Sequence, residues 1–110
     1  MRLVYEVIDI KSSDHPLFLD AIKLYLYYTK PELRTDSKEI AHWLDVCNDK
    51  FKDPFYILVL TLNKRLIGFA ELSYFLEEKF AIVDYVVIDE NFRERGAFNV
   101  FLGEIKQLFE

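Results

Sequence analysis

The sequence predicts a mixed α/β domain of the α+β type, with the element order β-α-α-β-β-β-α. Its 110 residues suffice for one hydrophobic core, and 52% of them are apolar. Apolar residues recur at helical spacing over residues 17–47 and form strand-length runs after residue 54. We therefore expect residues 1–110 to belong to a single domain, in which helices flank a mainly antiparallel sheet.

Composition and charge exclude several classes of protein. The apolar content rules out disorder, and the net charge of -5 argues against nucleic-acid binding, which needs a basic surface. No apolar run approaches the roughly 20 residues of a membrane helix, and the N-terminus lacks the apolar block of a signal peptide. The lone Cys47 excludes an internal disulfide and fits a reducing compartment. We therefore expect a cytoplasmic protein that binds neither nucleic acid nor membrane.

The chain begins with a predicted strand and a predicted helix. Residues 3–10 are rich in β-branched side chains and alternate in polarity, as a strand does. From residue 17 to about residue 28 apolar side chains recur at helical spacing. Asp14 is the expected N-cap of this helix, and Pro31 is expected to end it, because the residue before a proline disfavours helical geometry.

A second helix is predicted to open at Asp36. There Asp36 and Glu39 have the spacing of a capping box. A polar loop is expected over residues 48–54. The apolar stripe of this helix is predicted to consist of Ile40, Trp43, Leu44 and Cys47.

The second half of the chain predicts a meander followed by a helix. The three expected strands cover residues 55–62, 65–75 and 80–88. The polar pair Asn63-Lys64 indicates a tight hairpin between the first two, and residues 77–79 indicate a second turn. A charged loop over residues 89–96 leads into a helix expected at 97–109.

The most informative segment joins the last predicted strand to this final helix. It carries Arg93, Arg95 and Gly96 immediately before the helix begins. Free N–H groups at a helix start, with the positive end of the helix dipole behind them, bind phosphate groups. Arginines add charge-assisted hydrogen bonds, and glycine permits a close backbone approach. The alternative is a solvated turn whose arginines serve only solubility.

Two segments and the element order resemble the GCN5-related N-acetyltransferases (GNAT family). The segments are Leu66-Ile67-Gly68-Phe69-Ala70 and the Val-x-Ile-Asp-x-x-x-Arg-x-x-Gly run that starts at Val86. The family signature Arg/Gln-x-x-Gly-x-Gly/Ala reads here Arg93-Glu94-Arg95-Gly96-Ala97-Phe98. The resemblance implies acetyl-CoA as acyl donor. It implies that pantetheine meets the backbone of Val86, Val87 and Ile88, and that pyrophosphate meets Arg93, Arg95, Gly96, Ala97 and Phe98.

The sequence departs from this family at two points. Phe98 stands where the family has Gly or Ala, so its ring must point away from a bound phosphate or narrow the site. Family domains also continue beyond this helix with further strands, whereas this sequence ends at Glu110. We therefore expect the N-terminal part of a GNAT-like domain, apparently truncated after the third helix. Its exposed sheet edge is expected to form a homo-oligomer or to meet a completing partner.

Two carboxylates are candidate catalytic acid–base groups. Acyl transfer from a thioester requires an amine that has lost its proton, and a carboxylate can accept that proton. Strand alternation predicts that Asp84 shares a face with Ile82, Val86 and Ile88, where desolvation would raise its pKa. The alternative for Asp84 is a carboxylate at a wet sheet edge. Glu71 is the second candidate, and the alternative for it is an outward-facing residue.

No metal site is expected, because His15 and His42 have no Cys or carboxylate partner at metal-ligand spacing. Three tyrosines of the first helix, Tyr25, Tyr27 and Tyr28, are candidates to line an acceptor pocket, as the first two helices do in the family. The alternative is that these tyrosines pack in the core. The expected acceptor is a small-molecule or peptide amine, and the acidic net charge would steer a cationic one.

Three functions remain open from the sequence. The first is an N-acetyltransferase in which an amine attacks the thioester of acetyl-CoA directly, within a ternary complex. The second is a non-catalytic GNAT-like module for ligand sensing or protein interaction, which Phe98 and the missing second half both favour. The third is an unrelated α/β interaction domain whose arginine-rich loop is a surface turn.

Overall fold

A computed structural model describes residues 3–50 and 54–109, apart from the side chains of residues 47–50, 94 and 95. It confirms the predicted element order. The elements are β1 (Tyr5–Ile10), α1 (Phe18–Tyr28), α2 (Ser37–Lys50), β2 (Phe55–Leu62), β3 (Arg65–Phe75), β4 (Phe80–Ile88) and α3 (Ala97–Leu108). Two short 3-10 helices, η1 (Pro31–Leu33) and η2 (Glu90–Arg95), lie in the connections.

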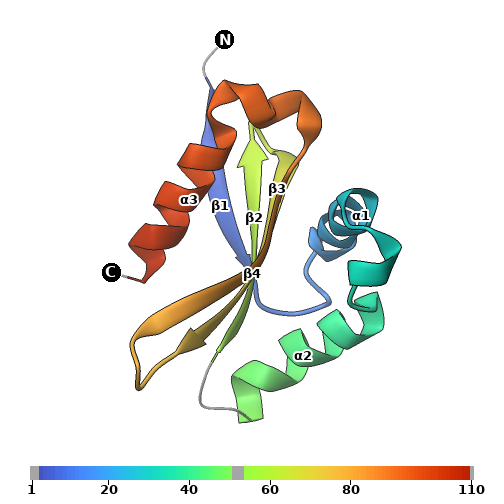
Figure 1. The fold of residues 1–110 in the computed structure, drawn as a ribbon, viewed down its shortest axis with the longest axis vertical. Coiled ribbons are helices and arrows are strands. Elements are labelled where there is room, and N and C mark those ends of the chain that lie inside the picture. Colours follow the sequence, from blue (N-terminus) through green and yellow to red (C-terminus); the bar gives the residue numbers. More distant parts are fainter. Residues whose placement is uncertain (1–2, 51–53, 110) are drawn as a thin grey trace.

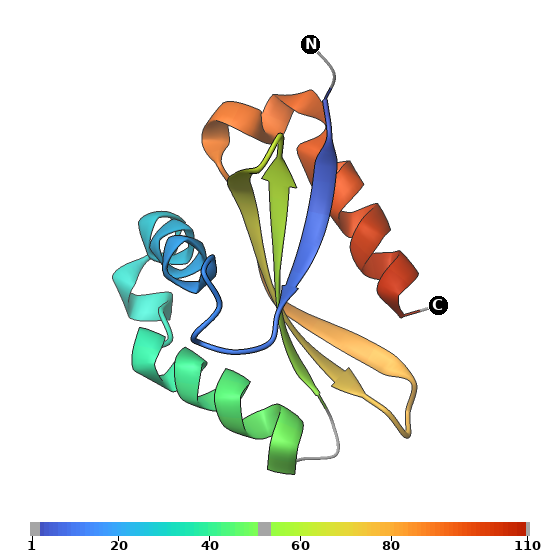
Figure 2. The same ribbon diagram turned by 180° about the vertical axis from the view of Figure 1, so that it is seen from behind.

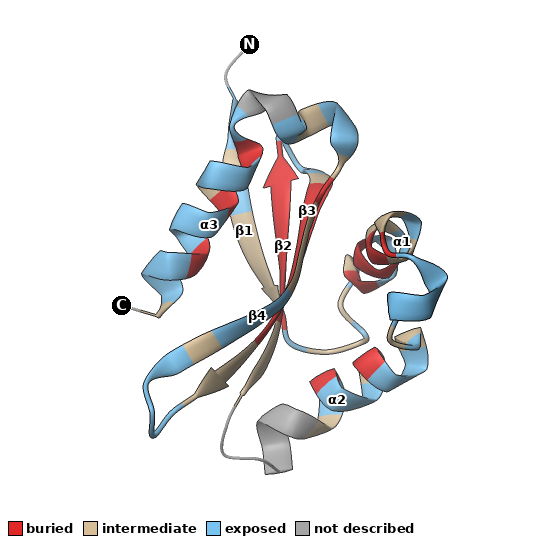
Figure 3. Cartoon of the chain, in the orientation of Figure 1, coloured by how far each residue is buried: buried red, intermediate tan, exposed pale blue. Residues whose placement is uncertain are grey.

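The four strands form one antiparallel sheet in the order β1-β2-β3-β4, which leaves β1 and β4 at its edges. Helices α1 and α2 cover one face, and α3 covers the other (Figures 1 and 2). Alternate residues of β2 and β3 point to opposite faces, so each face supplies its own apolar core. Figure 3 shows that burial is concentrated in these two central strands.

The core under α1 and α2 contains Ile10, Phe18, Ala21, Ile22, Tyr25, Ile40, Leu44, Ile57, Val59 and Phe69. The core under α3 contains Leu58, Leu60, Leu62, Ile67, Ala70, Leu72, Ile88, Ala97, Phe101 and Ile105. Both sets bury aliphatic and aromatic side chains on opposite sides of one sheet. Burial of these surfaces is the main favourable contribution to folding.

The predicted hairpin between β2 and β3 is confirmed. Asn63 and Lys64 both have positive φ, 48° and 69°, as a two-residue turn with the right twist requires. The Oδ1 atom of Asn63 also accepts a 2.8 Å hydrogen bond from the backbone N–H of Val4. The turn residues therefore fix both the hairpin and the approach of the N-terminal segment.

Gly68 on β3 faces the side chains that pack beneath α3. A Cβ atom at this position would lie 3.0 Å from Ile88 Cδ1 and 3.0 Å from Leu60 Cβ. It would also lie 3.3 Å from Cδ2 of Phe101 on α3. The absence of a side chain at Gly68 therefore lets the end of β4 and the middle of α3 pack against β3.

The start of α1 differs from the sequence prediction. The helix begins at Phe18, with Leu17 in the N-cap position, and Asp14 does not cap it. Asp14 lies instead in the preceding turn, where its N–H donates to Ser12 Oγ at 3.1 Å. The predicted end is confirmed, because α1 stops at Tyr28 before Pro31.

The second helix is confirmed at its start and is longer than predicted. Asp36 accepts a 2.8 Å hydrogen bond from the N–H of Lys38, as an N-cap does. Trp43 is 42% exposed, so its predicted place in the apolar stripe is wrong, whereas Ile40 and Leu44 are buried. The helix continues to Lys50, so the loop predicted from residue 48 begins later. The side chain of Cys47 and residues 51–53 lie outside the described residues.

Candidate functional site at the β4–α3 junction

The connection between β4 and α3 is more regular than predicted. The expected charged loop over residues 89–96 is largely the 3-10 helix η2. Asp89 caps it, since its side chain accepts a 3.0 Å hydrogen bond from the N–H of Asn91. Gly96 then adopts φ 76°, a left-handed conformation that side chains disfavour. This glycine lets the chain turn from η2 directly into α3.

Helix α3 begins immediately after Gly96, as the sequence predicts. Its first internal hydrogen bond runs from the N–H of Val100 to the carbonyl of Gly96, at 3.1 Å. Helix geometry leaves the N–H groups of Ala97, Phe98 and Asn99 without carbonyl partners inside the helix. These groups carry the positive end of the helix dipole, so the start of α3 favours a negatively charged group.

A cavity of about 390 Å³ lies between the end of β4, the loop and the start of α3. Its lining residues are Tyr28, Val86, Val87, Ile88, Arg93 and Phe98. Five of the predicted coenzyme-binding residues therefore meet at one place. Tyr28 was not expected there, and no sequence signal connected the end of α1 with this loop.

The remaining predicted coenzyme residues lie beside this cavity and do not line it. Ala97 is fully buried, so its side chain belongs to the core and only its backbone is near the site. Gly96 forms the turn before α3. The side chain of Arg95 lies outside the described residues.

Arg93 is held on two sides. Its Nε atom donates a 2.8 Å hydrogen bond to the carbonyl oxygen of Ile88 at the end of β4. Its Cζ atom lies 4.8 Å from the centroid of the Tyr28 ring, in a cation–π contact. The carbonyl of Ile88, one of the backbone groups expected to meet pantetheine, is therefore already bonded within the protein. The terminal N–H groups of the guanidinium are the part of Arg93 available to an anion.

Phe98 forms one wall of the cavity. Its side chain is 44% exposed, so the ring is not packed away beneath α3. Phe98 therefore borders the same cavity as Arg93 and the end of β4.

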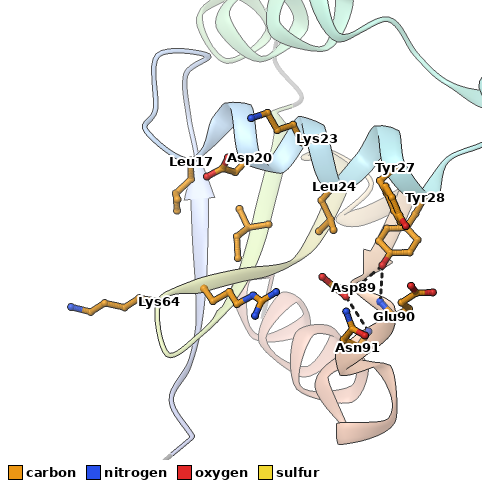
Figure 4. Close-up of a pocket in the computed structure, with 12 residues that line it drawn as sticks. Leu17, Asp20, Lys23, Leu24, Tyr27, Tyr28, Lys64, Asp89, Glu90 and Asn91 are labelled. Carbon is orange, nitrogen blue, oxygen red and sulfur yellow. Dashed lines mark hydrogen bonds between the residues drawn. The ribbon is translucent and has the colours of Figure 1, made fainter.

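A second cavity, of about 580 Å³, lies between α1, the β2–β3 hairpin and the start of η2 (Figure 4). Tyr28 lines both cavities. Its hydroxyl donates to Asp89 Oδ1 at 3.4 Å and accepts from the N–H of Glu90 at 2.9 Å. Other lining residues are Leu17, Asp20, Lys23, Leu24, Tyr27, Lys64, Arg65, Leu66 and Asn91. Both signs of charge occur, so the lining residues do not favour a ligand of one charge.

The three tyrosines of α1 divide between core and surface. Tyr25 is fully buried, and its ring packs 5.3 Å from the rings of Phe69 and Tyr85. Tyr27 and Tyr28 line the larger cavity instead. The packing alternative is therefore right for Tyr25, whereas Tyr27 is exposed, Tyr28 is half-buried and both line a cavity.

Glu71 is buried on β3, with 7% of its surface exposed, so its outward-facing alternative is wrong. It lies on the face covered by α1 and α2, in register with Ile57 on β2 and Tyr85 on β4. Burial raises the pKa of Glu71 to about 7, and the charge of Asp84 adds to this rise. Such a carboxyl group exchanges a proton near neutral pH.

Asp84 occupies an irregularity in the sheet that the sequence did not indicate. Glu71 pairs with Tyr85 but Leu72 pairs with Val83, so Asp84 is an extra residue between them. As a result Ile82 and Val86 point to opposite faces, and the prediction that Asp84 shares a face with Ile82, Val86 and Ile88 is wrong. Asp84 is exposed on the edge strand, although partial desolvation still raises its pKa. Its alternative, a carboxylate at a wet sheet edge, describes it better.

Within the described part of the chain, no group of three or more His, Cys, Asp or Glu side chains is placed to hold a metal ion. None of the helices within residues 3–50 and 54–109 has the length and hydropathy needed to span a membrane.

Comparisons with known proteins were made by sequence and by structure. No protein-family model matches the chain, and no curated protein matches it significantly. Two solved structures do resemble it, both of an aminoglycoside acetyltransferase from an uncultured soil metagenomic sample. One is in complex with trehalose, at a TM-score of 0.68 and 18% identity. The other is in complex with sisomicin, at a TM-score of 0.68 and 17% identity.

Each structural match covers 96% of this chain and 69% of the acetyltransferase chain. At this identity the likeness concerns the course of the backbone and not the site residues. The chain therefore shares its mixed α+β fold with these two acetyltransferase structures.

Proposed function

We propose that this chain forms the acetyl-CoA-binding part of an N-acetyltransferase domain, which transfers an acetyl group to an amine. One observation carries the proposal. The end of β4, the guanidinium of Arg93 and the start of α3 border a single cavity. That arrangement offers strand backbone to an extended arm and positive charge to a diphosphate, which are the two parts of coenzyme A nearest its thioester.

In this proposal the diphosphate lies between Arg93 and the N–H groups that open α3. The terminal guanidinium N–H groups can bond two phosphate oxygens at once, since a planar fork matches that geometry. The pantetheine arm runs along the edge of β4 past Val86 and Val87. Ile88 contributes its side chain and its N–H, because its carbonyl is bonded to Arg93.

The proposed chemistry is direct attack of the amine on the thioester carbonyl. The new C–N bond forms as the C–S bond breaks, and coenzyme A leaves as its thiolate. The attacking nitrogen must lose a proton, and Glu71 is the better candidate to receive it. Its pKa of about 7 matches the working pH, and it stands opposite Tyr85, the residue before Val86. We assign the exposed Asp84 a supporting role, in which its negative charge helps to raise the pKa of Glu71.

Measurements of turnover distinguish the roles of Glu71 and Asp84. Release of free coenzyme A thiol would be followed for Glu71→Gln and for Asp84→Asn, with a panel of small-molecule and peptide amines. We expect Glu71→Gln to lower the rate by about 100-fold, the usual contribution of a general base. Asp84→Asn is the matched control and should retain most of the rate. Full turnover by Glu71→Gln would remove that residue from the mechanism.

Binding is the first test of the proposal. Titration calorimetry with acetyl-CoA would use the longest natural form of the protein, because further segments would complete the site in the family that the sequence resembles. Saturable binding that Arg93→Ala weakens supports the coenzyme site. Absence of binding to the unmodified protein would reject it.

A non-catalytic relative is the second candidate, and Phe98 favours it. A ring in the wall of the cavity suits a small ligand or a peptide better than a bulky diphosphate. This candidate predicts no acetyl-CoA binding even when Phe98→Ala opens the cavity. Binding restored by that substitution would instead indicate a coenzyme site narrowed by one side chain.

We also propose that the edge of β4 is covered by a second copy or by a completing partner. Its first half exposes Phe80, Ile82 and Val83 on a strand that pairs on one side with β3 and has no neighbouring strand on the other within the described residues. Sedimentation of the protein over a range of concentrations tests this. Association that Ile82→Lys abolishes supports the proposal, and a stable monomer at high concentration counts against it.

A further inference from the structure

Tyr28 is the point where α1 meets the proposed coenzyme site. It is the last residue of α1, and its hydroxyl bonds two consecutive residues of the β4–α3 connection, Asp89 and Glu90. Figure 4 shows these contacts between the helix and the loop. The ring itself lies against the guanidinium of Arg93. One side chain therefore contacts both the backbone that shapes the loop and the cation that the loop presents.

The ring and the Ile88 carbonyl together determine where Arg93 points. The carbonyl takes the Nε–H at 2.8 Å, and the ring lies 4.8 Å from Cζ. An exposed arginine samples many rotamers, and ordering it on binding weakens affinity. Arg93 is exposed yet anchored at two points, so its terminal N–H groups are presented to the cavity before a ligand arrives. A cation held in advance binds an anion at a smaller entropic cost.

We propose that Tyr28 is a positioning residue of the coenzyme site, whose aromatic ring holds Arg93 toward the diphosphate of acetyl-CoA. This inference rests on the proposed function. It assigns the ring and the hydroxyl different tasks. The ring orients the cation, and the hydroxyl ties the first residues of η2 to the end of α1.

The two tasks can be separated by substitution. Tyr28→Phe keeps the ring and removes the hydroxyl, whereas Tyr28→Leu removes both. Leu19→Ala is the matched control, because Leu19 lies on the same helix, is largely exposed and lines neither cavity. Circular dichroism and thermal melting would verify that every variant folds. If Tyr28→Leu does not fold, the affinity of Tyr28→Phe for acetyl-CoA and the NMR signal of the Arg93 Nε–H group still test the proposal.

The decisive experiment is a double-mutant cycle in the affinity for acetyl-CoA. Calorimetry would compare the unmodified protein, Tyr28→Leu, Arg93→Gln and the double variant. We expect Tyr28→Leu alone to raise Kd about fivefold, the size of an exposed cation–π contact. In the Arg93→Gln background the same substitution should change Kd less than about twofold. Tyr28→Phe and Leu19→Ala should also stay within about twofold of the unmodified protein.

A second measurement needs no ligand. The Nε–H signal of Arg93 in a ¹⁵N-labelled protein should show the ring-current shift of a stacked guanidinium. That shift should persist in Tyr28→Phe and disappear in Tyr28→Leu.

The outcomes are distinguishable. Equal loss of affinity from Tyr28→Leu in both backgrounds would mean that Tyr28 acts only through the fold, and would overturn the inference alone. Equal losses from Tyr28→Phe and Tyr28→Leu would assign the effect to the hydroxyl and also overturn it. No binding of acetyl-CoA by the unmodified protein would reject the proposed function together with this role for Tyr28.

Discussion

The carboxyl groups of Glu71 on β3 and Asp84 on β4 interact electrostatically, as like charges. The pKa of Glu71 is raised from 4.5 to about 7. Burial is the larger cause, and the negative charge of Asp84 is the smaller one. Asp84 reaches this position because it is the extra residue of β4 at the point where the strand register shifts. The sheet irregularity therefore adds to the effect of burial on the pKa of Glu71.

The stability of the protein should fall as pH rises through this pKa window. Below pH 4.5 Glu71 is protonated in both the folded protein and the unfolded chain, so it does not make the free energy of unfolding depend on pH. Between pH 4.5 and about 7 the unfolded chain releases its proton while the folded protein retains it, which favours unfolding. Above pH 7 the difference between the folded and unfolded pKa of Glu71 lowers the free energy of unfolding by about 3 kcal/mol.

Glu71→Gln should remove this dependence, because glutamine does not titrate. Its free energy of unfolding, measured in urea at several pH values, should exceed that of the unmodified protein increasingly from pH 5 to pH 8. Glu78→Gln, in the exposed turn before β4, controls for the loss of one charge. A constant difference between Glu71→Gln and the unmodified protein across this range would contradict the raised pKa.

Removal of the Arg93 side chain should weaken acetyl-CoA binding and leave stability nearly unchanged. A charge-assisted bond to phosphate contributes roughly 1.5–3 kcal/mol, which corresponds to at least about a tenfold rise in Kd for Arg93→Ala. The side chain is exposed, so the melting temperature should change little. Arg65→Ala, on the β2–β3 hairpin side, is the control and should bind as the unmodified protein does.

Phe98→Ala should tighten acetyl-CoA binding if the ring narrows the coenzyme site. The substitution enlarges the cavity in front of the α3 amides, and the partly exposed ring contributes little to the core. We expect a severalfold lower Kd, since better access to one phosphate bond contributes about 1 kcal/mol. Leu102→Ala, one turn later on α3 and also partly exposed, is the matched control. Weaker binding by Phe98→Ala would show that the ring contacts the ligand favourably.

The two glycines Gly68 and Gly103 should respond oppositely to alanine. At Gly68 the new Cβ meets three neighbours at 3.0–3.3 Å, and two of the contacts involve β2 and α3. Gly68→Ala should therefore destabilise the protein by about 1–3 kcal/mol, as overpacking does. At Gly103, inside α3, nothing lies within 4 Å, so Gly103→Ala should stabilise by about 0.5–1 kcal/mol. Denaturant unfolding measures both, and equal effects would contradict the packing of α3 on β3.

Much of the secondary structure follows from local chemistry that is visible in the sequence. The strands β2, β3 and β4 have their predicted bounds, because turn residues interrupt runs of β-branched and aromatic side chains. The start of α3 was predictable for the same reason, since Gly96 is the residue that tolerates the left-handed turn before it. The position of Arg93 at the end of β4 follows from these two local facts.

Other features were beyond prediction because they depend on segments far apart in the chain. Trp43 has the spacing of a core residue, yet its side chain is 42% exposed. The spacing of Tyr28 indicates a residue of an amphipathic helix. It contacts Arg93 only because η2 packs against the end of α1. Asp84 was assigned to the wrong face because one extra residue in β4 reverses the alternation that a regular strand would keep.

The sequence by itself determined the element order, the turns and the location of the start of α3, because each depends on backbone preferences and side-chain periods within a few residues. Only the tertiary structure decided that Glu71 is buried beside Asp84 and that Tyr28 holds Arg93. Burial and pairing are set by which surfaces meet when the sheet closes against its helices, and that meeting depends on the whole set of packed elements and not on any one segment.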